Sequence, residues 1–257
     1  MQNMNYERMT RTQGWPVQAT GPREQRELIG TGIHAQADNS GDVLLSVRDF
    51  RIRLADTEAG RNSASMLLNR MYTWRGYSGK HELRNSPNRI SLTAHMKDEL
   101  VGTVTLSLDS ESGLMADEVF GNEISAYRTM DRKLCEITKL AFDPGKNSTF
   151  ALASLFHICF IYLRRIHQCT DLFIEVNPRH RRYYERMLGF QQLGELRTNT
   201  RVNAPAYLLW ASLGYIEEQI RLHGGTSDNP GTTRSLYPFF FSPREEEGIT
   251  GRLIALK

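Results

Sequence analysis

The feature that most restricts the fold of this chain is a repeated change in the spacing of its apolar residues. Apolar and polar side chains alternate along residues 50–54, 90–96 and 104–108, which is typical of strands with one buried face. Between the first two of these strands, residues 57–73 carry apolar side chains at helical spacing. The pattern therefore predicts a mixed α/β sheet, with a hairpin formed by the second and third strands.

The same pattern continues to residue 223 and predicts one main domain at 43–223. The further segments are a helical or irregular stretch at 116–130, strands at 134–142, 171–177 and 207–213, and helices at 150–166, 179–188 and 214–223. Pro144 stops the first of these strands, and Gly189 ends the helix at 179–188.

The two ends of the chain differ in composition from this domain. Residues 1–42 are polar and lack an apolar period, so we expect a mobile arm. The C-terminal tail, residues 224–257, begins with turn-forming residues and then carries an aromatic cluster of Tyr237, Phe239, Phe240 and Phe241. We expect this cluster to dock on the domain, either by core packing or over an apolar groove.

Composition and charge exclude several classes of protein. A net charge of +3 and a pI near 8.8 are too mild for a typical nucleic-acid-binding domain. Three cysteines in 257 residues do not make a disulfide framework, so a reducing cytoplasm is expected. The apolar run at 150–163 includes Ser154 and His157, which indicates a buried helix rather than a membrane span. The N-terminus lacks the apolar stretch of a signal peptide.

We expect neither a metal site nor a cysteine nucleophile. His157 and His167 lie ten residues apart on one predicted helix, a separation of roughly 15 Å, so they cannot share a zinc ion whose ligands lie about 2 Å away. Strand alternation points Cys135 away from Glu136. A buried structural thiol is the expected role of Cys135.

The segment TDLFIEVNPRHRRYYERMLGF resembles the last strand–helix unit of the GNAT acetyltransferase-like fold. The matching residues are Asn177, Pro178, Tyr184, Gly189 and Phe190. The resemblance implies that two parallel strands splay apart and admit the pantetheine arm of a thioester. In place of the glycine-rich turn that binds the pyrophosphate of coenzyme A, the chain reads DPGKNSTFALASLF, with the single glycine Gly145. This departure argues against acetyl-coenzyme A as the donor.

Four segments are similar to the long-chain N-acyl amino acid synthases of this fold. They are LLNRMYTWRGY, DRKLCEITKLAFDP, LFHICFIYLRRIHQCTDLFIEVNPRHRRYYERMLGF and GYIEEQIRLHGG. They also resemble, more distantly, the acyl-homoserine lactone synthases, which share a strand of the form Glu-x-Ser/Thr-Arg/Lys, here Glu136, Thr138 and Lys139. The resemblance implies a bacterial enzyme that needs no cofactor and moves an acyl group from acyl carrier protein to an amino acid.

Amide formation from a thioester needs a base for the amine and donors for the oxyanion. Alternation predicts that Glu136 and Thr138 share a face with Leu140 and Phe142. Apolar neighbours would raise the pKa of Glu136 toward that of a general base. Pairing with a basic residue is the alternative role, and Glu175 on the next strand is the competing base.

The resemblance also implies further catalytic and binding groups. In this fold the oxyanion is bound by backbone amides near the splay, here those of Leu140, Ala141 and Phe142. Tyr184 or its neighbour Tyr183 is expected to protonate the departing thiolate. The tyrosine stands five positions before the glycine, whereas the family's usual spacing is four.

Aromatic and basic residues around the expected cleft are candidates for substrate binding. They are Trp74, Arg75 and Tyr77 at the end of the first helix, Phe142 and Phe150 along an apolar cleft that Phe240 would extend, and Asn177. Arg70, Arg75 and Lys139 are candidates for the carboxylate of a free amino acid. A structural role is the alternative for each of these residues.

Two basic groups, 164–165 and 179–182, are either a docking surface for an acidic carrier protein or merely solvated. Two other enzymes on the same fold remain as alternatives, an N-acetyltransferase and an acyl-homoserine lactone synthase. The non-enzymatic alternative is a binding domain for acyl carrier protein or lipid. The presence of Glu136 and Tyr184 favours an enzyme over this non-enzymatic hypothesis.

Overall fold

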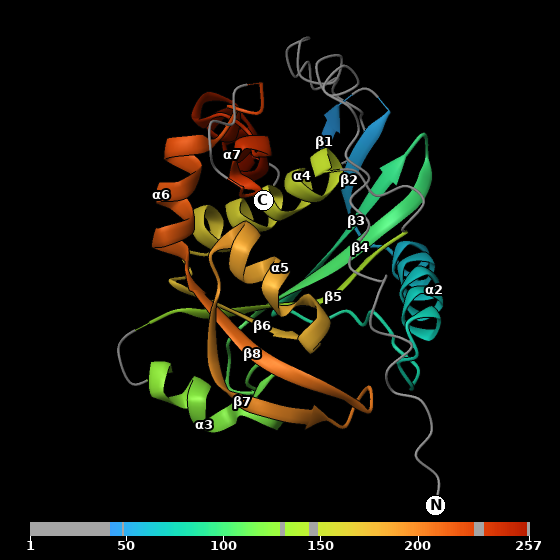
Figure 1. Ribbon diagram of the computed structural model, residues 1–257. Coiled ribbons are helices and arrows are strands. Elements are labelled where there is room, and N and C mark those ends of the chain that lie inside the picture. Colours follow the sequence, from blue (N-terminus) through green and yellow to red (C-terminus); the bar gives the residue numbers. More distant parts are fainter. Residues whose placement is uncertain (1–41, 48, 129–131, 144–148, 229–233, 256–257) are drawn as a thin grey trace, which may run out of the picture.

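The computed structural model describes residues 42–47, 49–128, 132–143, 149–228 and 234–255. Within these ranges the chain forms one eight-stranded sheet with helices packed on both faces (Figure 1). The expected N-terminal arm, apart from its last residue, lies outside the described residues, as does the loop 144–148 that contains Gly145.

The strands follow the order β1-β2-β3-β4-β5-β6-β8-β7 across the sheet. They are β1 (Val43–Val47), β2 (Phe50–Leu54), β3 (Arg89–Met96), β4 (Glu99–Leu108), β5 (Leu134–Phe142), β6 (Asp171–Val176), β7 (Gln191–Asn199) and β8 (Ala204–Ser212). The pair β5–β6 is parallel, whereas the neighbouring pairs β4–β5 and β6–β8 are antiparallel. The predicted mixed α/β class is confirmed, with the parallel pair inside the sheet.

The sequence pattern did not reveal β1 or β7. Most residues of β7 are exposed or half-buried, so the strand has no apolar alternation to detect. It exists because β8, which carries four buried residues, offers it a hydrogen-bonding edge. The ladder is irregular between Leu193 and Arg197, where Gly194 adopts a φ of 71° that favours glycine.

Polar caps begin two of the helices, and a glycine ends one of them. Thr57 precedes α2 (Glu58–Trp74), and its hydroxyl accepts a hydrogen bond from the backbone N of Gly60 at 3.0 Å. Asn177 caps α5 (Pro178–Leu188), which ends at Gly189 with a φ of 74°. The other helices are α3 (Asp117–Arg128), α4 (Thr149–Phe160), the π-helical turn η1 (Ile161–Ile166), α6 (Leu213–His223), the 3-10 turn η2 (Tyr237–Phe239) and α7 (Pro243–Ala255).

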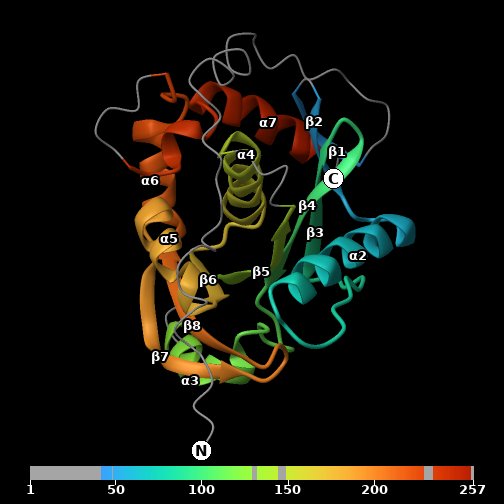
Figure 2. The same ribbon diagram turned by 45° about the vertical axis from the view of Figure 1, so that its right-hand side comes forward.

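The helices form two layers around the sheet (Figures 1 and 2). One layer contains α2, which packs against Ala141, and α3, which packs against Phe173. The other contains α4, α5, α6 and α7, which share the largest apolar cluster with the opposite face of the sheet. In the described chain, Thr149–Ile166 is the single stretch apolar and long enough to cross a membrane, but 78% of it is buried inside the protein. It is the core helix that the sequence predicted.

A β-bulge interrupts β5 at its centre. Thr138 pairs with Thr105, whereas Ala141 pairs with Thr103. Over this stretch β5 therefore has one residue more than β4. Lys139 takes up the extra length with a φ of 52°, in the left-handed region.

The bulge changes the face of the sheet to which the following side chains point. Phe142 packs in the same apolar cluster as Ile137, on the face covered by α4, while Ala141 packs against α2. The prediction that Glu136 and Phe142 share a face is therefore wrong, because one extra residue inverts the alternation beyond Thr138.

The aromatic cluster of the C-terminal segment is part of the main core. Tyr237 is 1% exposed and its hydroxyl donates to the backbone oxygen of Leu188 at 2.6 Å. The backbone N of Phe241 donates to Nδ1 of the fully buried His157 at 2.9 Å, and the ring of Phe240 stacks on the same histidine. The segment therefore docks, as expected, through core packing against α4 and α5.

Candidate active site

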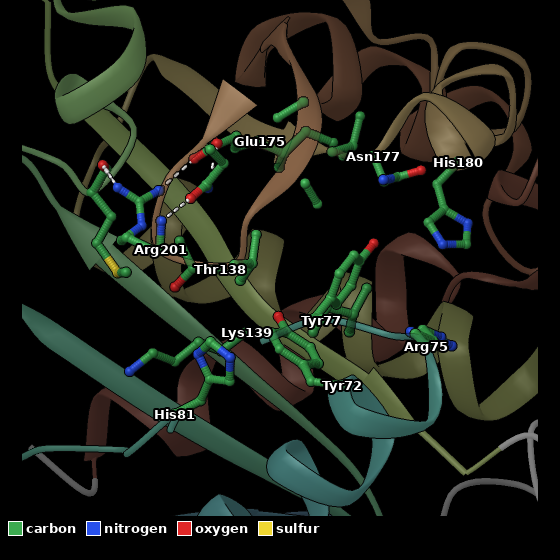
Figure 3. Close-up of a pocket in the computed structure, with 18 of the residues that line it drawn as sticks. Tyr72, Arg75, Tyr77, His81, Thr138, Lys139, Glu175, Asn177, His180 and Arg201 are labelled. Carbon is green, nitrogen blue, oxygen red and sulfur yellow. Dashed lines mark hydrogen bonds and ion pairs between the residues drawn. The ribbon is translucent and has the colours of Figure 1, made fainter. Parts of the chain in front are cut away.

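A pocket opens where the two parallel strands diverge (Figure 3). The β5–β6 ladder ends at Ile137 and Ile174, although both strands continue. Beyond this point the pocket is lined by β5, β6, the residues that follow α2, the start of α5 and the turn between β7 and β8. Such a divergence leaves room between adjacent strands for a ligand.

A carboxylate and a guanidinium lie in contact at one end of the pocket (Figure 3). Arg201 Nη2 donates to Glu175 Oε2 at 2.5 Å, and Asn199 Nδ2 donates to Glu175 Oε1 at 2.5 Å. Burial raises the pKa of Glu175, while the charge of Arg201 and the two hydrogen bonds oppose that rise. Glu175 thus combines access to the pocket with a pKa raised above the usual value for a carboxyl, which is the direction that favours a general base.

Glu136 lies behind the pocket wall rather than in it. It is fully buried and is not among the pocket-lining residues. Its Oε2 accepts a hydrogen bond from the backbone N of Met115 at 2.8 Å, and its Oε1 accepts one from Ala116 at 3.0 Å. Burial raises the pKa of Glu136 to about 8, and these two hydrogen bonds limit the rise. In this position Glu136 anchors the segment that carries Met115 into the pocket.

Cationic and aromatic side chains gather at the other end of the pocket, where Figure 3 places Arg75, Tyr77 and His180. The guanidinium of Arg179 lies 5.3 Å from the ring centroid of Tyr77, and its Nη2 donates to the backbone oxygen of Arg75 at 3.4 Å. Burial and these two arginines lower the pKa of His180 to about 3, so it is neutral. This end of the pocket suits an anionic group.

Two hydroxyl groups on the pocket wall are suited to proton transfer or hydrogen bonding. Tyr184 lines the pocket, and burial raises its pKa well above the usual range, so it retains its proton. Its neighbour Tyr183 does not line the pocket. The hydroxyl oxygen of Thr138 is buried and has no hydrogen-bond partner among the described residues.

Lys139 is held at the lower wall of the pocket beside His81 (Figure 3). Its Nζ donates to the backbone oxygen of Glu82. Burial, together with the charges of Arg89 and Arg84, lowers the pKa of Lys139 to about 8.

The structure brings most of the predicted site residues together. Those that line the pocket are Arg75, Tyr77, Thr138, Lys139, Leu140, Asn177 and Tyr184, with the competing base Glu175. Six predicted residues do not line the pocket, and one of them, Glu136, is described above. Trp74 is 54% exposed on α2, Ala141 and Phe142 are buried, and Phe150 packs edge-on against Phe50. The carboxylate candidate Arg70 instead pairs with Asp143 at 3.1 Å.

Sequence reasoning missed Arg201, Asn199 and His81. Arg201 and Asn199 belong to a polar hairpin without an apolar period, and only the pairing of β7 with β8 brings the hairpin to the pocket. His81 follows α2 in an irregular segment. No local signal in the sequence distinguishes these residues from surface positions.

Across the described part of the chain, no group of three His, Cys, Asp or Glu side chains is arranged to hold a metal ion. Nε2 of His157 lies 3.0 Å from the carboxylate of Glu246, and Nδ1 accepts a hydrogen bond from the backbone N of Phe241. Both ring nitrogens therefore already have partners within the protein.

Comparisons with known proteins place these observations in a family. The sequence model of the family "N-acyl amino acid synthase FeeM" matches residues 63–212. A search of curated proteins finds no match. The structure of FeeM, an N-acyl amino acid synthase from uncultured soil microbes, is similar with a TM-score of 0.59 and 26% identity, and covers 66% of this chain and 94% of that one.

Two further solved structures are similar with lower TM-scores and lower identity. An acyl-CoA N-acyltransferase from Pseudomonas aeruginosa has a TM-score of 0.44 and 13% identity, over 63% of this chain and 97% of that one. An acetyltransferase of the GNAT family from Streptococcus pneumoniae has a TM-score of 0.44 and 14% identity, over 63% of this chain and 98% of that one.

Proposed function

This chain belongs to the N-acyl amino acid synthase FeeM family, and from that premise we propose that it moves a long-chain acyl group from acyl carrier protein to the α-amine of an amino acid. The resemblance seen in the sequence is confirmed, the fold is GNAT-like, and the chain is an N-acyltransferase. The donor, the residues that carry the reaction and the steps below are our proposal.

The observation that carries the proposal is the pocket at the β5–β6 divergence, with Glu175 at one end and the protonated Tyr184 on its wall. A base and an acid in one pocket are what direct amide formation from a thioester requires. No enzyme nucleophile is needed, because the amine itself attacks the thioester.

The proposed reaction assigns one proton transfer to each of these groups. Glu175 takes a proton from the α-ammonium group, and the freed amine attacks the thioester carbon to form the C–N bond. The oxyanion is stabilised by the backbone N–H of Leu140 beside the bulge and by the hydroxyl of Thr138, which has no hydrogen-bond partner among the residues that the structure describes. The nitrogen loses its extra proton to solvent, the C–S bond breaks, and the thiolate receives a proton from Tyr184. The proton held by Glu175 then returns through solvent to Tyr184, which restores both groups.

The pocket's apolar members support an acyl chain as the transferred group. Ile137, Ile174, Val176 and Ala206 line it together with Met115. The three cysteines are buried and free, which supports our placing the reaction in a reducing cytoplasm.

We expect long-chain acyl carrier protein to be a better donor than acyl-coenzyme A or acetyl-coenzyme A. The sequence between β5 and α4, residues 143–148, contains the single glycine Gly145, and side chains with a Cβ keep a pyrophosphate from approaching backbone amides. Purified protein is given each donor with a pool of amino acids, and the amide products are measured by mass spectrometry. A free amino acid should be acylated without S-adenosylmethionine.

Two other products would contradict this assignment. Efficient acetylation from acetyl-coenzyme A, with no product from carrier-bound long chains, would indicate an N-acetyltransferase. A lactone formed only with S-adenosylmethionine would indicate an acyl-homoserine lactone synthase.

We expect exposed arginines on α5 to contribute to carrier docking. Arg182 and Arg186 are exposed and have no ion-pair partner in the portion of the chain that the structure describes, whereas Arg181 is engaged by Glu185 at 3.2 Å and by Gln192 at 2.6 Å. Replacing Arg182 and Arg186 together by Glu should raise KM for carrier-bound donor several-fold, and more at low salt, because an acidic carrier is attracted by exposed charge.

The control separates docking from chemistry. The same variant should use a short acyl-pantetheine donor at the wild-type rate, and Arg252→Glu, at an exposed position on α7, should leave both donors unaffected. An equal loss with carrier-bound and short donors would show that α5 is not the docking surface.

A further inference from the structure

We infer that the Glu175–Arg201 pair recognises the acceptor as a zwitterion, with Arg201 binding the α-carboxylate beside the α-ammonium group held by Glu175. This inference rests on the proposed function. It assigns to Arg201 the selection of free α-amino acids over simple amines.

The first support is the geometry of the pair. Glu175 and Arg201 touch at 2.5 Å and both line the pocket. The ammonium and carboxylate groups of a free amino acid are attached to the same carbon, so they occupy neighbouring positions with opposite charges. A carboxylate and a guanidinium side by side present the complementary arrangement.

The second support is the unused hydrogen-bonding capacity of Arg201. Its Nη1 donates to the backbone oxygen of Met115 at 2.7 Å and to Glu118 at 2.7 Å, and its Nη2 donates to Glu175. A guanidinium has five N–H groups. The Nε–H and one N–H of Nη2 have no hydrogen-bond partner within the described residues, so Arg201 has two donors left for the carboxylate of an acceptor.

The third support is that the Arg201 side chain is held rigidly in place. Arg201 is held by β6 through Glu175 and by the start of α3 through Glu118, and its backbone N donates to Asn199 Oδ1 at 2.8 Å. The side chain of Arg201 is 24% exposed and that of Glu175 is 7% exposed. Because both groups are already ordered and largely desolvated, little additional entropy is lost when an acceptor binds.

Two of the carboxylate candidates from the sequence, Lys139 and Arg75, also line the pocket. The Nζ of Lys139 already donates to the backbone oxygen of Glu82, so Arg75 is the stronger competitor. It lies at the opposite end of the pocket from Glu175 (Figure 3), among Arg179 and His180. An amino acid whose amine contacts Glu175 cannot place its α-carboxylate there, because only one carbon separates the two groups. Arg75 is therefore assigned to a different anionic group.

The test compares amino acids with their decarboxylated amines as acceptors. Leucine, phenylalanine and tyrosine are each paired with the matching amine, isoamylamine, phenethylamine or tyramine, and kcat/KM is measured with long-chain acyl carrier protein. The ratio of amino acid to amine is then compared between variants. Comparing ratios cancels both the intrinsic reactivity of each amine and any general loss of activity.

Wild-type protein should favour the amino acid in each pair that it accepts. Arg201→Gln should lower the ratio roughly ten- to hundredfold, because hydrogen bonds to a charged group are lost. Arg201→Lys keeps the positive charge and the contact with Glu175 but lacks the planar guanidinium, so it should give an intermediate ratio. This variant replaces Arg201→Gln in the test if the Gln variant does not fold. Arg75→Gln should leave the ratio unchanged, whatever it does to the rates.

A matched control is Arg197→Gln. Arg197 lies on β7 and bridges Glu123 and the backbone oxygen of Val119 in the same manner, but it does not line the pocket. An unchanged ratio in folded Arg201→Gln, or a collapsed ratio in Arg75→Gln, would overturn the inference. A wild-type enzyme that acylates amines as well as amino acids would also overturn it while leaving acyl transfer intact. If no acceptor is acylated at all, the proposed function fails instead.

Discussion

Replacing Glu175 by Gln should lower kcat by roughly 10²- to 10⁴-fold, the loss typical of a missing acid–base group. Glutamine keeps the shape of the side chain and still accepts a hydrogen bond, so we expect the variant to fold. Steady-state kinetics with carrier-bound donor and a preferred amino acid provides the measurement.

The pH dependence supplies a second readout for the same variant. Burial raises the pKa of Glu175, and a base acts only when deprotonated. The wild-type rate should therefore fall as the pH drops through this raised pKa. The Glu175→Gln variant should lack that acidic limb, because glutamine does not titrate.

Glu136→Gln is the matched control. Glu136 is fully buried behind the wall and does not line the pocket. Glutamine has one acceptor oxygen for the two N–H groups of Met115 and Ala116, which should cost about 1–3 kcal/mol of stability but less turnover than Glu175→Gln. A folded Glu136→Gln variant that loses turnover, beside an active Glu175→Gln, would return the role of base to Glu136.

Truncating Tyr237 to Ala should lower the free energy of unfolding by about 3–5 kcal/mol, the range for a large buried aromatic side chain. Tyr237 is 1% exposed, packs against Phe240 with ring centroids 5.2 Å apart, and donates its hydroxyl to Leu188. Tyr237→Phe, which loses the hydroxyl alone, should cost about 1–3 kcal/mol. Urea denaturation of each variant gives these differences.

The expected result would make residues 234–255 part of the folding unit rather than an appended tail. Leu222→Ala, at a position 50% exposed on α6, should change stability by about 0.5 kcal/mol or less. If Tyr237→Ala costs no more than Leu222→Ala, the boundary expected at residue 223 describes the stable domain, and the C-terminal segment is dispensable for folding.

Local patterns were sufficient wherever one short segment determines its own structure. Alternation identified β2 and the β3–β4 hairpin, because one buried face imposes a period of two on each strand. Gly189 marked the end of a helix through a backbone angle that involves only neighbouring residues. The same logic could not reveal β7, which is a strand because of its partner and not because of its own apolar spacing.

The sequence by itself determined the family, the order of most elements and the strands that diverge, since these depend on motifs and periods within a few residues. The tertiary structure alone decided which carboxylate reaches the pocket. Glu136 and Glu175 lie on adjacent strands. The carboxylate of Glu136 is buried and accepts hydrogen bonds from the backbone N–H groups of Met115 and Ala116, whereas that of Glu175 contacts Arg201 in the pocket. The tertiary structure also decided to which face of the sheet Phe142 points, because the bulge at Lys139 inverts an alternation that the sequence shows as unbroken. Both outcomes depend on contacts between residues distant in the chain, and no local pattern records such contacts.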